Sequence, residues 1–163
     1  MTTDFKRIIP HLVAHDIEFV LIGGVAAAAH GSARATYDVD VVYARNSANL
    51  ERLAAALAPL KPYLRGAPPG LPFRWNVETI RSGLNFTLTT SLGDLDVLGE
   101  VAGGGTYEQL LPHTLEAEMF DVKLRVVTLE RLIQLKRAAG RPKDLEAIAE
   151  LQALLEEQSK RST

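Results

Sequence analysis

The sequence predicts an α/β (α+β) fold: a mixed sheet flanked by helices and followed by a C-terminal helical segment. Short apolar runs, of which 19–22 is the clearest, are typical of buried strands. Elsewhere apolar residues recur three and four positions apart, which is typical of amphipathic helices. Strands and helices alternate early and helices alone come last. We therefore expect an α/β core over residues 1–127 and C-terminal helices over 128–163 that pack on it as one compact unit.

Composition limits the class of protein. The chain has 163 residues, 47% of them hydrophobic, which is enough for one domain with a substantial core. Cysteine is absent, which excludes disulfides, thiolate zinc sites and a thiol nucleophile. The net charge of −2 argues against a nucleic-acid coat protein. No apolar run reaches the roughly 18 residues of a membrane span. The N-terminus also lacks the apolar stretch of a secretory signal, so we expect a cytoplasmic protein.

The first predicted helix covers residues 5–13, where apolar residues lie at helical spacing. Thr3 is the expected N-cap, and Pro10 would kink this helix or delay its start. The wholly apolar run 19–22 predicts a buried strand, and the alanine-rich run 25–30 predicts a short helix after it.

A second strand is predicted over 37–43, and Ser47 is expected to cap a third helix that ends at Pro59. Residues 59–72 contain five prolines and two glycines, so we expect a long loop, a kind of segment that is often functional. The remaining predicted elements are strands at 85–90 and 95–98, a helix at 106–111, a hairpin of 117–120 and 123–127, and helices at 128–139 and 142–157.

Two carboxylates alternate on the second predicted strand, in the run Asp38-Val39-Asp40-Val41. Side chains two residues apart on a strand point to the same face, with Cα atoms about 6.5–7 Å apart. Asp38 and Asp40 would therefore lie side by side, with the valines in the core. Two anions this close repel, and magnesium held by carboxylates and phosphate oxygens would offset the repulsion. For such a pair taken alone, the alternative is a strand face in contact with water.

A glycine pair, Gly23-Gly24, ends the first strand fourteen residues before Asp38. Glycine lets the backbone approach a ligand closely, and backbone N–H groups at a helix start can bind phosphate. Taken alone, the pair is equally a tight turn between strand and helix. A strand, a glycine pair, a helix and then a carboxylate pair together place phosphate beside metal, and this combination is more specific than either part.

This combination resembles the nucleotidyltransferase superfamily related to DNA polymerase beta, whose pattern is an apolar residue, Gly, Gly or Ser, a spacer, and Asp-apolar-Asp-apolar. The string GGVAAAAHGSARATYDVDVV is similar to the branch that contains AbiEii-type toxins and small bacterial nucleotidyltransferases. The segment LERLIQLKRAAGRPKDLEAIAEL also looks like that branch, and the resemblance covers residues 19–155.

The resemblance implies in-line nucleotidyl transfer from an NTP, with Asp38, Asp40 and a third carboxylate holding two magnesium ions. Asp96 is the expected third carboxylate because apolar residues flank it, as in a buried strand. It would also accept the proton of the attacking hydroxyl. Asp94, which lies on the same strand face and follows Gly93, is the alternative.

The resemblance also implies a set of nucleotide-binding residues. Gly23 and Gly24 would bind the β- and γ-phosphates, and Lys136 matches the family's helix lysine and would contact the triphosphate. The secondary candidates, which are equally ordinary turn, loop or strand-start residues, are Ser32, Arg34 and Thr36.

Basic residues concentrate near the C-terminus, with seven against one acid in 123–143. Such a run is usually a solvated helix face, but here it would balance a triphosphate or an RNA backbone. Asp144 matches an acid of the family, and we expect it to cap a helix or to pair with Arg141 rather than to act in the chemistry.

We therefore predict a magnesium-dependent nucleotidyltransferase that moves a nucleoside monophosphate from an NTP to a hydroxyl of an RNA or tRNA end, a protein or a small molecule. The resemblance further implies a toxin of a toxin–antitoxin pair, with a cognate antitoxin as partner. The alternative is a non-catalytic nucleotide- or RNA-binding module, or an antitoxin-like partner subunit on the same fold. Three intact aspartates favour the enzyme, since a dead site need not keep them.

Overall fold

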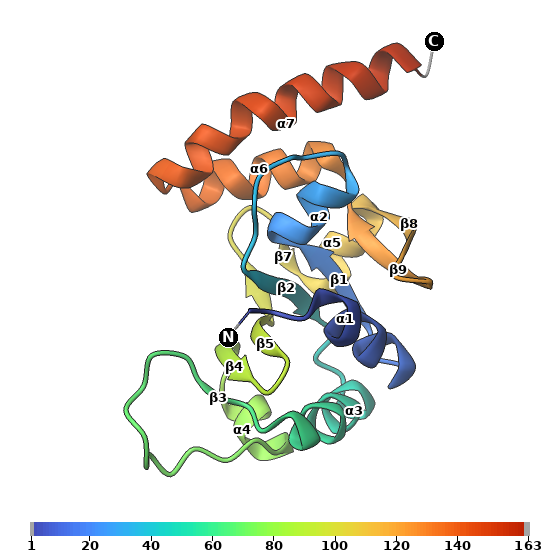
Figure 1. Cartoon of the computed structure of the whole chain (residues 1–163). Coiled ribbons are helices and arrows are strands. Elements are labelled where there is room, and N and C mark those ends of the chain that lie inside the picture. Colours follow the sequence, from blue (N-terminus) through green and yellow to red (C-terminus); the bar gives the residue numbers. More distant parts are fainter. Residues whose placement is uncertain (1, 162–163) are drawn as a thin grey trace.

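A seven-stranded mixed sheet forms the centre of the computed structural model, which describes residues 2–161 (Figure 1). The strands lie in the order β3-β4-β5-β2-β1-β9-β8. Their bounds are β1 Phe19–Ile22, β2 Asp38–Tyr43, β3 Tyr63–Leu64, β4 Asn85–Thr90, β5 Gly93–Leu98, β8 Thr114–Met119 and β9 Val122–Val127. A separate small sheet pairs β6 (Glu100–Val101) with β7 (Gly105–Thr106).

Helices surround this sheet. Their bounds are α1 Phe5–Ala14, α2 Gly23–Ala29, α3 Ser47–Leu57, α4 Val77–Ser82, α5 Tyr107–Leu110, α6 Leu129–Ala139 and α7 Pro142–Arg161, with 3-10 turns at Ala58–Leu60 and Leu111–His113. α2, α6 and α7 stack at one end of the molecule, and α3 and α4 lie at the opposite end (Figure 1). The mixed sheet with flanking helices confirms the predicted fold class. Within residues 2–161 no helix combines the length and the apolar character that crossing a membrane requires.

Three central strands, β1, β2 and β5, position the site. β1 runs antiparallel to β2, and β2 runs parallel to β5. The register places Asp40 opposite Ile22 on one side and opposite Asp96 on the other. Val39 and Leu95 are completely buried, as the alternation predicts. The aspartates between these apolar residues therefore point to the opposite face of the sheet.

The predicted caps of the first and third helices are each wrong by one residue. Asn46 rather than Ser47 caps α3, and its side-chain oxygen accepts a hydrogen bond from the Asn49 N–H at 3.0 Å. Asp4 stands at the N-cap of α1, and Thr3 lies one position earlier. The Thr3 hydroxyl instead donates to the backbone oxygen just before β2 (2.5 Å) and accepts from a backbone N–H of β5 (3.0 Å). It therefore ties together the two strands that carry the aspartates.

Other boundaries differ where tertiary contacts decide them. Pro10 lies inside α1, which nevertheless runs without a break from Phe5 to Ala14. The predicted loop 59–72 contains the short strand β3, which forms because β4 supplies its hydrogen-bond partners. α4, the β6–β7 sheet and the first two residues of β5 were also not predicted. The cap at Thr128 and the left-handed Gly140 (φ 67°) bound α6 as predicted.

Candidate active site

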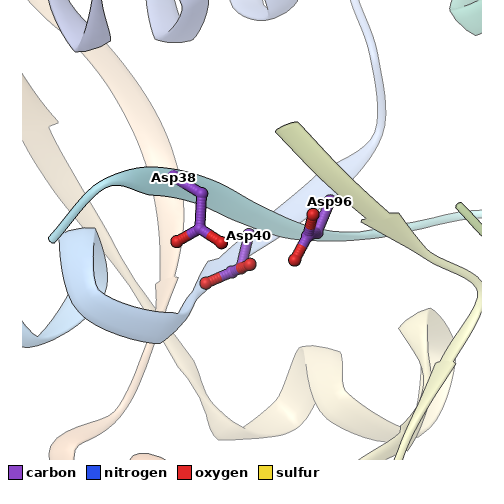
Figure 2. A group of neighbouring side chains, drawn as sticks. All are labelled: Asp38, Asp40 and Asp96. Carbon is purple, nitrogen blue, oxygen red and sulfur yellow. The ribbon is translucent and has the colours of Figure 1, made fainter. Parts of the chain in front are cut away.

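Three carboxylates lie together on one face of the central strands, as Figure 2 shows. Asp38 and Asp40 come from β2 and Asp96 from the adjacent β5. One carboxylate oxygen of each lies within 4.8 Å of the others. The period-2 alternation of a strand places the first two on one face, and the parallel register brings Asp96 beside Asp40.

Asp96, and not Asp94, belongs to this group. Asp94 lies opposite Asp38 in the register, at the start of β5, but falls outside the group of three. Its Oδ1 lies 3.5 Å from Nε of Arg65. Of the two candidates on this strand, the geometry therefore favours Asp96 as the third carboxylate.

The carboxylates are short of positive charge. Burial, the negative charge of Asp38 and a hydrogen bond with Asp96 raise the pKa of Asp40 to about 8, although Lys136 acts in the opposite direction. Burial also raises the pKa of Asp38, and so does the charge of Asp96. A divalent cation bound here would relieve this repulsion. Closely spaced carboxylate oxygens are also the ligands that magnesium prefers, so the residues fit such an ion.

The glycine pair allows α2 to start against the aspartate strand. A Cβ on Gly23, whose φ is 72°, would lie 2.1 Å from Oδ2 of Asp40. A Cβ on Gly24 would lie 2.4 Å from Oγ1 of Thr36. A larger residue at either position would force Asp40 or Thr36 to move, so the glycines allow the backbone at the end of β1 to lie directly beside the aspartate strand.

A polar cleft of about 270 Å³ opens over the aspartates and is lined on its other side by basic residues from the region where α6 meets α7. On that side Lys136 pairs with Asp144, whose Oδ1 lies 3.4 Å from Nζ of the lysine. Arg141 holds the same carboxylate, its Nε donating at 2.6 Å. Asp144 is only 1% exposed, so it acts as a buried anchor, as the sequence predicted for its pairing with Arg141. Lys143 completes the basic side.

The three secondary candidates lie on the segment that leads into β2. Thr36 lines the cleft and donates from its hydroxyl to the backbone oxygen of Asp38 at 3.3 Å. Arg34 also lines the cleft, with a long contact of 3.9 Å to Glu146 of α7. Ser32 lies outside this lining and donates to Glu150 at 2.6 Å. That hydroxyl therefore fastens the segment to α7.

The basic run 123–143 does not form one surface. Lys136, Arg141 and Lys143 reach the cleft. Lys123 and Arg125, on β9, line a different groove beside Phe19 and Tyr107. The sequence suggested a common phosphate-facing region because it could not show that the chain changes direction between β9 and α6.

Arg65 is the residue of the site that the sequence did not reveal. Its NH2 group donates to Oδ1 of Asp96 at 2.8 Å, and its NH1 group lies 3.7 Å from Oδ2 of Asp38. It follows β3 within the proline-rich segment, far from both motifs in the chain. A single arginine in such a segment belongs to no motif with a defined spacing, so the sequence does not predict its position. Only the pairing of β3 with β4 shows that Arg65 lies beside the aspartates.

The fold and this arrangement of carboxylates define the class of protein, a nucleotidyltransferase. The chain belongs to the family described as nucleotidyl transferase AbiEii toxin of type IV toxin–antitoxin systems, whose profile matches residues 7–145. This confirms the resemblance on which the sequence-based function rests.

A solved structure supports the fold independently. The crystal structure of the lincosamide antibiotic adenylyltransferase LnuA, bound to lincomycin, superposes with a TM-score of 0.62 at 13% sequence identity. The match covers 94% of this chain and 99% of that one. No curated protein matches this sequence.

Proposed function

We propose that this nucleotidyltransferase is magnesium-dependent and transfers a nucleoside monophosphate from an NTP to a hydroxyl acceptor, releasing pyrophosphate. The observation that carries the proposal is the group Asp38, Asp40 and Asp96 facing a cleft whose other side is basic. Carboxylates suit a divalent cation and basic residues suit phosphate, and nucleotidyl transfer needs both within one site.

In the proposed reaction the acceptor oxygen forms a bond to the α-phosphorus of the NTP. The bond from that phosphorus to the bridging oxygen breaks, and its electron pair leaves with pyrophosphate. The Asp96 carboxylate accepts the hydroxyl proton. Magnesium held by Asp38, Asp40 and Asp96 would supply Lewis-acid stabilisation of the phosphate charge.

The cleft suggests how the nucleotide is held. Lys136, Arg141 and Lys143 would donate to the triphosphate, because cationic donors to phosphate are among the strongest hydrogen bonds in proteins. Gly23 and Gly24 would let the phosphates approach the backbone. Thr36 and Arg34 are secondary contacts from the segment before β2, and Ser32 supports that segment through Glu150.

For the acceptor and the biological role, we propose a toxin that acts in the cytoplasm and is neutralised by a cognate antitoxin, as the description of the family suggests. An RNA or tRNA end is the first candidate acceptor. A protein hydroxyl is the second. A small molecule is the third, since the structural neighbour LnuA is an adenylyltransferase of a lincosamide antibiotic.

The decisive experiment is a transfer assay with each α-labelled NTP, magnesium, and RNA, protein or small-molecule fractions as separate acceptors. Asp40→Asn should lower transfer by at least about 100-fold, since it removes one of the three carboxylates that would hold the metal. Asp121→Asn is the matched control, because Asp121 is exposed in the β8–β9 turn and should leave transfer unchanged.

Equal labelling by the wild type and Asp40→Asn, or labelling by neither, would contradict the proposal. Nucleotide binding without transfer would instead favour the non-catalytic module. The toxin role is tested separately by growth arrest on expression. Relief by the product of a neighbouring gene is the expected result, and growth unaffected by expression would refute this role.

A further inference from the structure

Arg65 lies among the carboxylates of the site. It follows β3, and its side chain is 27% exposed. The guanidinium contacts Asp96 at 2.8 Å, Asp94 at 3.5 Å and Asp38 at 3.7 Å. One cation therefore serves three anions, and two of these belong to the group that would hold the metal.

The approach of Arg65 differs from that of the other basic residues. Its NH2 group also donates to the backbone oxygen of Leu88 on β4 at 2.7 Å, so the side chain extends across β4 toward β5. Lys136, Arg141 and Lys143 instead come from the α6–α7 region, where α6 packs against α2. The carboxylates thus lie between two separate sources of positive charge.

A guanidinium and a divalent cation require the same oxygen atoms. The Arg65 hydrogen bond occupies Oδ1 of Asp96, and the NH1 group of Arg65 lies 3.7 Å from Oδ2 of Asp38. The Nε atom is buried without a hydrogen bond, although Asp94 lies near it. The hydrogen bonds of the guanidinium are therefore incomplete. Its contacts to Asp38 and Asp96 must weaken before a metal ion can bind the same carboxylate oxygens.

We propose that Arg65 is the resident counter-charge of the carboxylate group and competes with divalent cations for Asp38 and Asp96. A cation that binds these carboxylates weakens their contacts with Arg65. This coupling is reciprocal: the factor by which the cation weakens the contacts of Arg65 is also the factor by which Arg65 lowers the affinity of the nucleotide-free site for the cation. Arg65 is in this sense a positioning residue that sets the metal affinity. The inference rests on the proposed function, because it assumes that these carboxylates hold a metal.

The test measures the binding of Mn²⁺ alone to nucleotide-free protein, by electron paramagnetic resonance of the free ion. Arg65→Gln should bind Mn²⁺ at least about fivefold more tightly than the wild type, the lower end of common coupling strengths. Arg65→Lys, which keeps the charge without the fork of donors, should lie between them. Arg74→Gln is the matched control, since Arg74 is exposed in the loop that joins β3 to α4, which also contains Arg65, and the change in net charge is identical.

Unchanged or weaker Mn²⁺ binding in folded Arg65→Gln would overturn the inference, and so would equal tightening in Arg74→Gln. If Arg65→Gln does not fold, the comparison of Arg65→Lys with the wild type replaces it, and Mn²⁺ binding by Arg65→Lys that is no tighter than by the wild type would overturn the inference. The side-chain Nε resonance of Arg65 in the wild type should shift on adding Mg²⁺, and an unmoved resonance at saturating Mg²⁺ would refute competition. Label transfer tests the proposed function independently, so the two can fail separately.

Discussion

Gly23 lies against the Asp40 carboxylate at the point where β1 turns into α2. Two constraints act on this residue. Its φ of 72° is in the left-handed region, which L side chains rarely adopt, and a methyl group there would meet Oδ2 of Asp40 at 2.1 Å. At the residue scale Gly23 is therefore required for packing against the Asp40 carboxylate, in addition to any contact with phosphate.

Gly23→Ala should lower the free energy of unfolding by more than the about 1–3 kcal/mol of backbone strain alone, because Asp40 must also move. Gly70→Ala is the control. Gly70 has a φ of 90° but nothing within 4 Å of an added Cβ, so it should show the strain alone. Urea unfolding measures both. Equal losses in the two variants would contradict the steric role assigned to Asp40.

At the scale of elements, the contact between α6 and α7 forms the basic side of the cleft. Asp144 lies in the first turn of α7 and is 1% exposed. Its Oδ2 accepts a hydrogen bond from Nε of Arg141 at 2.6 Å, and its Oδ1 lies 3.4 Å from Nζ of Lys136. These charges, together with the hydrogen bonds from Arg141, keep the pKa of Asp144 below its ordinary value, although burial acts to raise it. One buried carboxylate thus holds two of the three basic residues that α6, α7 and their junction contribute to the cleft.

Asp144→Asn should lower the free energy of unfolding by about 1–3 kcal/mol, because it weakens the hydrogen bonds that a buried carboxylate accepts from two charged donors. It should also weaken NTP binding, since Lys136 loses the contact that holds it in the cleft. Glu157→Gln is the control on the same helix, where the ion pair is exposed and worth little. Thermal unfolding and nucleotide titration measure the two effects. An Asp144→Asn protein as stable as Glu157→Gln would show that this anchor is dispensable.

At the scale of the whole molecule, the net charge of −2 averages two opposed features. Acids gather on β2 and β5, and bases gather on the facing helices and at Arg65. The acids lie too close together to be satisfied by these bases alone, because Asp38 and Asp40 both have raised pKa values. The metal-free fold therefore carries an electrostatic cost at neutral pH.

The free energy of unfolding of the metal-free protein should accordingly fall as the pH rises from about 4 to about 8. The folded pKa of Asp40, about 8, exceeds its ordinary value of 3.8, so over this range the folded state binds the proton that the unfolded state has already lost. Stability that is present at low pH is then lost as Asp40 ionises. Urea unfolding in a chelator at several pH values measures this loss.

Two comparisons isolate the contribution of Asp40. Asp40→Asn should flatten the pH dependence and be more stable than the wild type at pH about 8. Mg²⁺ should restore stability to the wild type and much less to Asp40→Asn. If the Asp40→Asn curve runs parallel to the wild-type curve, folding does not raise the pKa of Asp40.

The sequence by itself determined the parts of the site that local periodicity controls. Asp38 and Asp40 had to lie on one face once 38–43 formed a strand, because strand side chains alternate. The same alternation made Asp96 a candidate, and its apolar neighbours favoured it over Asp94. The sequence also predicted the close backbone approach at the glycine pair and both ends of α6, because a glycine turn and helix capping depend on nearby residues.

Only the tertiary structure decided which distant residues meet. The parallel pairing of β2 with β5 places Asp96 beside Asp40. The pairing of β3 with β4 places Arg65 within reach of the aspartates on β2 and β5. The turn between β9 and α6 separated Lys123 from Lys136 although one basic run contains them. These contacts join segments far apart in the chain, and their stability comes from shared burial and strand pairing, which no local pattern of residues encodes.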